Sequence, residues 1–305
     1  MKEAKAFAPA SIGNVAVGFD MLGHALQGAG DTATVRLTTT GTVRVTAIRG
    51  VVADLPTRAK DNTAGRALLG LAKLRPGVGF EVELDKGIPL GSGMGGSAAS
   101  AVAALVAANS LLTKPVPLET LYDLAMDGEA AASGSKHGDN VAPMLLGGLV
   151  IAPVRGVPVR VPVPSTLFCA LVHPHFVLET RKSRAALKGA YELHDFVVQS
   201  EGLALLLAGC WNKDFELIRR GFRDVLVEPR RARLIPGFAR VKEAALDSGA
   251  LGSSISGGGP SVFAWFDSKA KAQKAGAAMA QAFHSVKLGA DVLISKVAAP
   301  GARVL

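Results

Sequence analysis

The chain is poor in cysteine, in long apolar runs and in aromatic residues, and each shortage excludes a class of protein. Its 305 residues include two cysteines, Cys169 and Cys210, which lack metal-ligand spacing. We expect both to be buried thiols in a reducing cytosol. No run reaches the ~18 apolar residues that a membrane span needs, and the N-terminus lacks the apolar core of a signal peptide. We therefore expect a cytoplasmic protein with no membrane partner.

The low aromatic content also bears on nucleic acid. A net charge of +9 could serve a polyanion, but the basic residues concentrate between Arg181 and Arg240, and aromatics make up only 5% of the chain. No RRM, KH or helix-turn-helix signature is present. Most of the charge is predicted to be a solvated face, with part of it serving an anionic ligand. We expect no nucleic-acid partner, and such binding remains a minor alternative.

What the chain does have is enough apolar sequence for a large core. Hydrophobic residues make up 49% and charged residues 19% of the chain, values typical of a compact soluble protein. The length of 305 residues predicts a division into two domains. Residues 149–163 are strand-like but contain Gly156 and several prolines. A boundary near Val157 is the prediction, giving domains 1–157 and 158–305.

The most informative stretch is residues 88–100, which hold four glycines within six residues. Apolar and polar residues alternate over 78–85, as in a half-buried strand. Residues 97–112 are rich in Ala and free of Gly and Pro, which predicts a helix. A glycine loop between a strand and a helix directs backbone N–H groups and a helix dipole at one point, and a phosphate is the natural occupant. A purely structural turn is the alternative. The glycines are Gly91, Gly93, Gly95 and Gly96.

The loop is not a Walker A motif, because no Lys-Ser/Thr follows its last glycine. It closely resembles the P-x-G-x-G-x-G-S-S-A-A loop of the GHMP small-molecule kinases, and departs from it at Gly96, where the family usually carries Ser. The resemblance implies that ATP is bound by the loop and that Mg²⁺ is held by Ser97 and Glu129. The implied ATP-binding residues are Pro89, Leu90, Gly91, Ser92, Gly93, Met94, Gly95, Gly96, Ser97 and Ala98.

Residues 8–23 contain Asn14 and Asp20 among apolar neighbours, and by composition these two are turn residues. The segment nevertheless resembles the P-A-S-x-A-N-L-G-P-G-F-D-x-L-G opening of the homoserine kinases. It departs at Ala16 and Val17, where Gly-Pro is usual. The resemblance implies that Asn14 and Asp20 contact an amino-acid substrate.

A second polar cluster follows Glu129, in a stretch predicted as a loop. His137, Asp139 and Asn140 match the E-x7-H-x-D-N-V-A-P-x-L-x-G-G pattern of the homoserine kinases position for position. A carboxylate, an imidazole and an amide within twelve residues suit a metal and a polar substrate. Surface loops also collect such residues, which is the plainer interpretation.

The C-terminal half carries further matches. Residues 228–238 resemble the E-P-Y-R-A-x-L-I-P-G-F block, with Arg230 in place of the Tyr and Arg231 at the substrate arginine. Residues 255–261 resemble the I-S-G-x-G-P-[ST] motif and include Gly257. A second arginine is placed at Arg184 because the family has a Thr four residues earlier, as Thr180 stands here, and Arg181 is its rival. Surface arginines in a basic stretch are the alternative.

The resemblance spans the chain and implies an α+β, two-domain GHMP kinase fold, with a ribosomal S5-like N-terminal half and a ferredoxin-like C-terminal half. It implies ATP:L-homoserine phosphotransfer, with substrate and ATP as partners and a possible homodimer. Another GHMP kinase, mevalonate- or shikimate-kinase-like, and a silent nucleotide-binding regulator are the alternatives. The implied catalytic residues are Asn140, Glu129 and Ser97, and the implied substrate-binding residues are Asn14, Asp20, His137, Asn140, Thr180, Arg184, Arg231 and Gly257.

Two further expectations concern chemistry and local structure. We predict that no carboxylate acts as general base, because Asn140 stands where related kinases have Asp, with Asp139 as the rival base. Asp61 and Ser268 are predicted to cap helices that end near residues 74 and 284. Other helices are predicted over 117–133, 193–207 and 214–222, and strands over 33–37, 42–48, 167–172 and 291–297.

Overall fold

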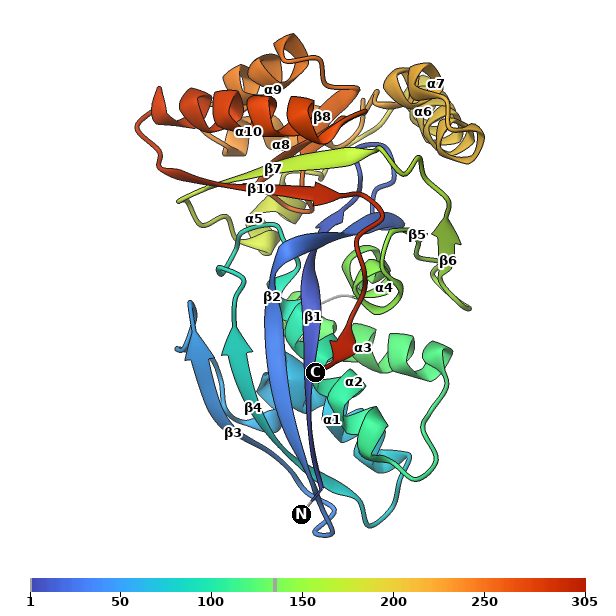
Figure 1. Ribbon diagram of the computed structural model, residues 1–305, viewed down its shortest axis with the longest axis vertical. Helices are drawn as coiled ribbons and strands as arrows, with labels where there is room; N and C mark the ends of the chain where they lie inside the picture. Colours follow the sequence, from blue (N-terminus) through green and yellow to red (C-terminus); the bar gives the residue numbers. More distant parts are fainter. Residues whose placement is uncertain (1, 134–135) are drawn as a thin grey trace.

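The computed structural model describes residues 2–133 and 136–305, which form two parts stacked along the long axis of the molecule (Figure 1). A seven-stranded sheet with four helices makes the N-terminal part, and a four-stranded sheet with two helices on its outer face makes most of the C-terminal part. The α+β class with two parts is therefore confirmed.

The first sheet has the strand order β11-β1-β2-β4-β3, with a short hairpin of β5 and β6 attached to β2. All its pairs are antiparallel except β3 with β4, which α1 connects as a crossover. Because β11 pairs with β1, the end of the chain returns to the first sheet. The strands are β1 Glu3–Gly13, β2 Leu22–Thr38, β3 Val43–Gly50, β4 Gly79–Lys86, β5 Leu149–Ile151, β6 Val159–Val161 and β11 Arg303–Val304.

Helix α2 (Gly96–Leu111) lies at the centre of the N-terminal part, against β1 and β2 and beside the other helices. Ten of its sixteen residues are buried, and most of those are alanines. A helix that is apolar on all sides is stable only inside a core. Small side chains let the neighbours approach it closely, and this fixes its N-terminus in space. The neighbours are α1 Thr63–Lys73, α3 Leu118–Ser133 and α4 Gly138–Leu146.

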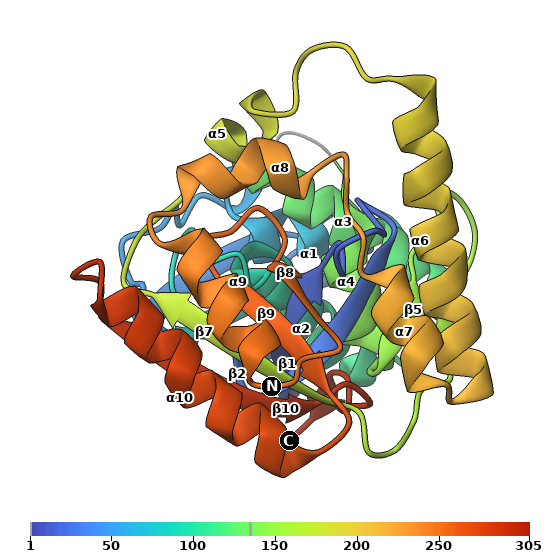
Figure 2. The ribbon, with the colours of Figure 1, turned by 90° about the horizontal axis from the view of Figure 1, so that it is seen from above.

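The second sheet has the order β10-β7-β9-β8, and all its pairs are antiparallel. With the helices between β7 and β8 and α10 between β9 and β10, this is a ferredoxin-like βαββαβ arrangement. Helices α9 and α10 cover its outer face, while the α6–α7 pair stands to one side (Figure 2). The strands are β7 Phe168–Pro174, β8 Gly252–Ile255, β9 Val262–Phe266 and β10 Ala290–Lys296. The helices are α5 Thr180–Ala185, α6 Leu193–Asn212, α7 Phe215–Gly221, α8 Glu228–Arg231, α9 Phe238–Asp247 and α10 Lys269–His284.

The inner face of the second sheet packs on β2, so one core runs through both parts. Trp265 Nε1 on β9 donates to His24 Nε2 on β2 at 3.2 Å. Nδ1 of His24 lies 2.9 Å from the Ala25 carbonyl, so this nitrogen carries the proton. Burial lowers the pKa of His24 to about 4, which keeps the ring neutral and its Nε2 an acceptor.

Most predicted elements are confirmed, including the strand before the glycine loop, the central helix and the cap at Ser268. Two predictions are wrong. Asn62, not Asp61, caps α1: its side chain accepts from Gly65 N at 3.1 Å, while Asp61 ends a 3-10 turn. The stretch after His137 is the helix α4 rather than a loop. Pro143 within it and the glycines at its end are residues typical of loops, which is why a loop was predicted. Gly134 and Ser135 of that motif lie outside the described residues.

The structure also bears on the cysteines and on the possibility of a membrane-spanning helix. Cys169 and Cys210 are both free and buried, as predicted. Burial also raises the pKa of each thiol, so neither is a reactive thiolate. No helix within residues 2–133 and 136–305 is long and apolar enough to cross a bilayer.

Candidate active site

A cavity of about 920 Å³ lies where the glycine loop, α4 and α5 meet. All the predicted substrate-binding residues line it, as do Ser97, Glu129 and most of the glycine loop. The exceptions are Met94 and Ala98, whose side chains are buried in the core and do not line the cavity. Residues up to about 243 positions apart in sequence are therefore brought to one site, as the Asn14–Gly257 hydrogen bond illustrates.

The glycine loop runs from the end of β4 to the start of α2. Gly91, Gly93 and Gly95 have φ of 60°, 77° and 73°, a left-handed conformation that glycine adopts without strain. A Cβ on Gly93 would lie 2.5 Å from the Ser256 carbonyl oxygen, so a side chain there would collide with the second glycine loop.

The backbone carbonyl groups of the glycine loop accept hydrogen bonds from residues outside the loop. Four consecutive carbonyl oxygens, at residues 91–94, accept hydrogen bonds of 2.7 to 3.3 Å. Three of the four donor residues belong to the C-terminal half. Because the carbonyls point away, the loop N–H groups and the N-terminus of α2 remain as the polar groups for the cavity. The donor residues are Leu178, Ser261, Ser256 and Ser11, in the order of the carbonyls.

A buried ion pair between Lys86 and Asp31 contacts the N-terminal end of α2. Lys86 Nζ contacts Asp31 Oδ2 and donates to the Gly96 carbonyl and Ser100 Oγ, both at 2.7 Å. Ser100 in turn donates to Asp31 at 2.7 Å. A buried charge pair is tolerated where hydrogen bonds satisfy both partners. Sequence analysis missed this cluster, whose members are separated by up to 69 positions and form no motif.

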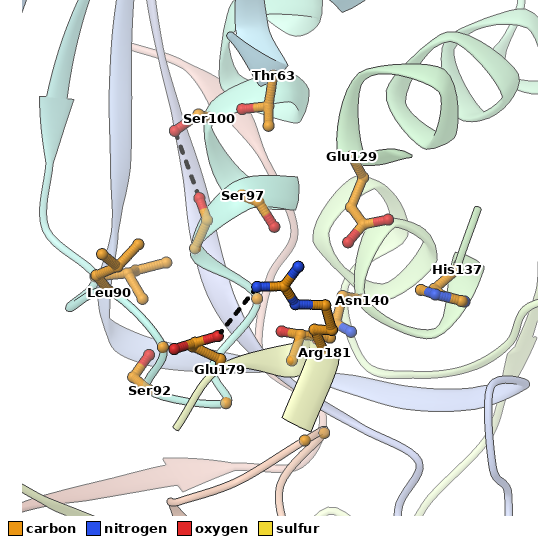
Figure 3. Close-up of a pocket in the computed structure, with 18 of the residues that line it drawn as sticks. Thr63, Leu90, Ser92, Ser97, Ser100, Glu129, His137, Asn140, Glu179 and Arg181 are labelled. Carbon is orange, nitrogen blue, oxygen red and sulfur yellow. Dashed lines mark hydrogen bonds and ion pairs between the residues drawn. The ribbon is translucent and has the colours of Figure 1, made fainter. Parts of the chain in front are cut away.

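Ser97, Glu129 and Thr63 face the cavity beside the N-terminus of α2 (Figure 3). Glu129 is largely buried and reaches the cavity from α3. A hydroxyl and a carboxylate are hard oxygen donors that suit Mg²⁺, which also takes phosphate oxygens and water. The chemistry of these two side chains therefore suits Mg²⁺ that takes its remaining ligands from phosphate oxygens and water. Within the described ranges, no group of three or more His, Cys, Asp or Glu side chains could hold a metal ion alone.

Apolar residues that were not predicted also line the cavity, together with Leu90, which was predicted. They are Val52, Leu55 and Pro56, and Asn62 lines the cavity with them. Asn62 donates its Nδ2 to the Pro56 carbonyl at 2.8 Å, which ties this segment to the start of α1. The spacing of Val52, Leu55 and Pro56 follows neither the strand nor the helix period, so no sequence signal identified these three residues.

Residues 14–20 form a strained turn on the other side of the cavity. Asn14 and Asp20 have φ of 70° and 58°, and Ala16, one of the departures from the family pattern, has 58°. Asn14 Oδ1 accepts from Asp20 N at 3.0 Å, and its Nδ2 donates to the Gly257 carbonyl at 2.8 Å. The turn therefore forms despite the departure, and Asn14 holds Asp20 and Gly257 in place.

Two arginines lie against the ring of Phe19. Their guanidinium carbons are 5.6 Å (Arg184) and 5.3 Å (Arg231) from its ring centre. Arg231 is only 2% exposed, and burial, with the nearby charge of Arg184, lowers its pKa to about 10. It donates to the carbonyls of Ser183 and Gly257. Phe19 was matched in the motif without a role, and the structure makes it the platform for both cations.

Arg184 also organises the polar side chains opposite it. It donates to Asp20 Oδ1 at 2.7 Å and contacts His137 Nδ1 at 3.1 Å. Because a guanidinium only donates, His137 Nδ1 accepts, and burial lowers the pKa of this ring. The Nε of Arg184 is buried and meets no acceptor within the described part of the chain. A donor is thus left for a ligand.

Asn140 and Asp139 lie side by side at the start of α4. Ser11 Oγ donates to Asn140 Oδ1 at 2.8 Å, which orients the amide. Asp139 is 2% exposed, its Oδ2 accepts from Asn14 N at 3.1 Å, and its Oδ1 has no partner among the described residues. Burial, and then the charge of Asp20, raise the pKa of Asp139 to about 7.

Comparison with protein families gives two matches that together cover more than half of the chain. Residues 62–148 match the GHMP kinases N terminal domain, and residues 203–285 match the GHMP kinases C terminal domain. The first match contains the glycine loop, Glu129 and the start of α4. The second contains Arg231 and the second glycine loop.

Full-length relatives are also similar. A homoserine kinase of Xanthomonas campestris pv. campestris is 56% identical over 306 residues, covering 100% of this chain and 95% of the relative. A crystal structure of homoserine kinase from Cytophaga hutchinsonii has a TM-score of 0.94 at 44% identity, covering 100% of this chain and 98% of that one. The L. major mevalonate kinase structure, at 15% identity and a TM-score of 0.65 over 97% of this chain and 96% of that one, shares the fold alone.

Proposed function

The chain belongs to the homoserine kinases, within the GHMP kinases, and we propose that it transfers the γ-phosphoryl group of ATP to the hydroxyl of L-homoserine. The observation that carries this proposal is the arrangement of one cavity. At one end lies the glycine loop, whose carbonyl groups are hydrogen-bonded to other residues. At the other end lie Arg184 and Arg231, which contact the ring of Phe19. The product, O-phospho-L-homoserine, places the reaction in threonine biosynthesis.

We place the triphosphate against residues 89–97 and the base against the apolar wall near Leu55 and Pro56. The loop N–H groups and the α2 dipole favour phosphate oxygens over other ligands. Ser97 and Glu129 would hold Mg²⁺, which when bound neutralises phosphate charge and orients the γ-phosphoryl group. The arrangement of hydroxyl and carboxylate beside the helix end supports this placement.

We place homoserine with its carboxylate between Arg184 and Arg231. Both guanidinium groups line the cavity, and the buried Nε of Arg184 has no acceptor among the described residues. Burial, and then repulsion by Arg184, lower the pKa of Arg231. A carboxylate would relieve that repulsion and accept charge-assisted hydrogen bonds. Asp20 would receive the ammonium group. His137, Asn140, Thr180 and Gly257 would complete the contacts.

We propose that the acceptor hydroxyl gives its proton directly to a phosphate oxygen or to water. Asn140 has no accessible protonation change, and its Oδ1 is held by Ser11. The amide NH₂ group is then a donor for the hydroxyl or the phosphoryl oxygens. One carboxylate oxygen of Asp139 accepts a hydrogen bond from Asn14 N. This supports a role for Asp139 in shaping the turn of residues 14–20 rather than in accepting the proton of the substrate hydroxyl.

Three wider proposals go with this function. A division at residue 157 puts the glycine loop and α4 in the first domain and both arginines in the second, although β11 returns to the first sheet. The buried free thiols of Cys169 and Cys210 agree with a reducing cytoplasm. A homodimer also remains a proposal.

The decisive experiment measures ADP release with ATP and Mg²⁺, in the presence and absence of L-homoserine. Release that depends on homoserine supports the proposal. Release with mevalonate or shikimate instead would indicate another GHMP kinase activity, and ATP binding without release would indicate a silent regulator. In Arg231→Leu, kcat/KM for homoserine should fall ~10- to 150-fold with little change in ATP affinity, because a charge-assisted hydrogen bond is lost.

A further inference from the structure

Helix α5 presents two arginines to the cavity rather than one. Thr180, Arg181, Arg184 and Ala185 all line it, and this spacing of one, four and five positions is one face of a helix. Arg184 turns toward Asp20, 2.7 Å away, at the end where the turn of residues 14–20 lies. Arg181 pairs with Glu179 at 3.9 Å, and Figure 3 shows its guanidinium on the side of the cavity where Ser97 and Glu179 are drawn.

Two other cations that line the cavity are already held by protein groups. Lys86 is buried against Asp31 and the Gly96 carbonyl, and Arg231 donates to the carbonyls of Ser183 and Gly257. The ion pair of Arg181 with Glu179 is long, at 3.9 Å, and the side chain of Arg181 is 92% exposed. Its donors can therefore turn to a ligand with little loss of existing contacts.

Phosphoryl transfer places negative charge where Arg181 can reach. The bond from phosphorus to the bridging oxygen of ADP breaks, its electron pair leaves with ADP, and a new bond forms to the acceptor oxygen. Charge spreads over the three remaining oxygens of the phosphoryl group during this exchange. A planar guanidinium with several donors suits those oxygens better than an ammonium does.

We propose that Arg181 binds the γ-phosphoryl group of ATP while Arg184, one turn along the same helix, binds the carboxylate of the acceptor. This inference rests on the proposed function, and it assigns the two arginines to two different anions. Helix α5 would thereby set the separation between the phosphoryl group and the amino acid. ADP, which lacks the γ-phosphoryl group, would gain nothing from Arg181.

The test compares Arg181→Gln with Lys182→Gln. Lys182 has the same charge, lies next in the chain, pairs with the same Glu179 at 3.5 Å and does not line the cavity. Calorimetry with Mg²⁺ and either ATP or ADP should show ATP binding weakened ~10- to 100-fold in Arg181→Gln and ADP binding unchanged, because a charge-assisted contact is lost. Lys182→Gln should alter neither. In turnover, Arg181→Gln should lower kcat and leave the KM for homoserine unchanged.

Several results would overturn the proposal. Equal weakening of ATP and ADP would place Arg181 on another phosphate, and a raised KM for homoserine alone would place it on the carboxylate. Equal effects in both variants would reduce Arg181 to a surface charge. If the wild-type protein released no ADP with homoserine, the proposed function would fail, while the ratio of ATP to ADP affinity would still decide the assignment of Arg181. Circular dichroism verifies that each variant is folded.

Discussion

The buried carboxyl of Asp139 should make the protein less stable as the pH rises, and Asp139→Asn should remove that effect. Its pKa is raised from the ordinary 3.8 to about 7, so the folded state binds the proton more tightly than the unfolded chain does. The resulting stability is complete below pH 3.8 and is lost as the pH rises toward 7. A shift of about 3 pH units at ~1.36 kcal/mol each corresponds to about 4 kcal/mol.

The gain from Asp139→Asn will be smaller than that figure. The amide oxygen can still accept from Asn14 N, but the NH₂ group would occupy the place of Oδ1, which has no partner among the described residues. An unpaired buried donor costs about 1–3 kcal/mol. We therefore expect the variant to exceed the wild type by about 1–3 kcal/mol near pH 8 and to fall below it near pH 5.

The assay is urea unfolding of both proteins at about pH 5, 6.5 and 8, with turnover measured on the same samples. Asp54→Asn, at an exposed carboxylate, is the matched control and should follow the wild type. Parallel curves for wild type and Asp139→Asn would show that this carboxyl does not titrate in the expected range. A folded variant that lost ~10³-fold or more in turnover would make Asp139 the general base and refute direct proton transfer.

Three further outcomes are expected. As the pH falls from 6.5 to about 4, the wild type should lose ~3 kcal/mol that His24→Gln does not lose, because burial keeps His24 neutral in the folded state while the unfolded chain binds a proton; urea unfolding measures this. Ser256→Ala should weaken ATP binding in calorimetry, because the carbonyl of Gly93 loses its 2.7 Å donor; unchanged affinity would mean that the loop holds its shape alone. Glu129→Gln should raise the Mg²⁺ concentration needed for ATP binding, and an unchanged Mg²⁺ dependence would remove Glu129 from the metal site.

Local features of the chain were predictable because their causes are local. The strand, the glycines and the helix that follow one another over 78–112 were predicted from alternation and composition. Asp61 and Asn62 are adjacent, and either side chain can cap the helix α1, so the sequence did not show which of them is the cap. Asn62 is the cap rather than Asp61 because its backbone is extended, at φ −105° and ψ 136°, as the end of the preceding turn requires.

The site residues were found through motifs, and the groups that hold them were not. Ser11 lies 129 positions from Asn140, and Asp31 lies 55 positions from Lys86, so no spacing in the chain relates them. Phe19 was visible in the motif, but its role depends on two arginines brought up from the other half. Such contacts follow from how the two sheets pack, which a one-dimensional pattern does not encode.

The carbonyl groups of the glycine loop have a consequence for how the protein is made. Three of their four donor residues, Leu178, Ser256 and Ser261, follow the loop by more than eighty residues and leave the ribosome long after it. A nascent chain that ends before residue 256 can pair most of its first sheet, yet its loop lacks donors at Ser92 and Gly93. We therefore expect the glycine loop to take its final shape only when translation is nearly finished, and we expect nucleotide to stabilise the N-terminal half poorly before then.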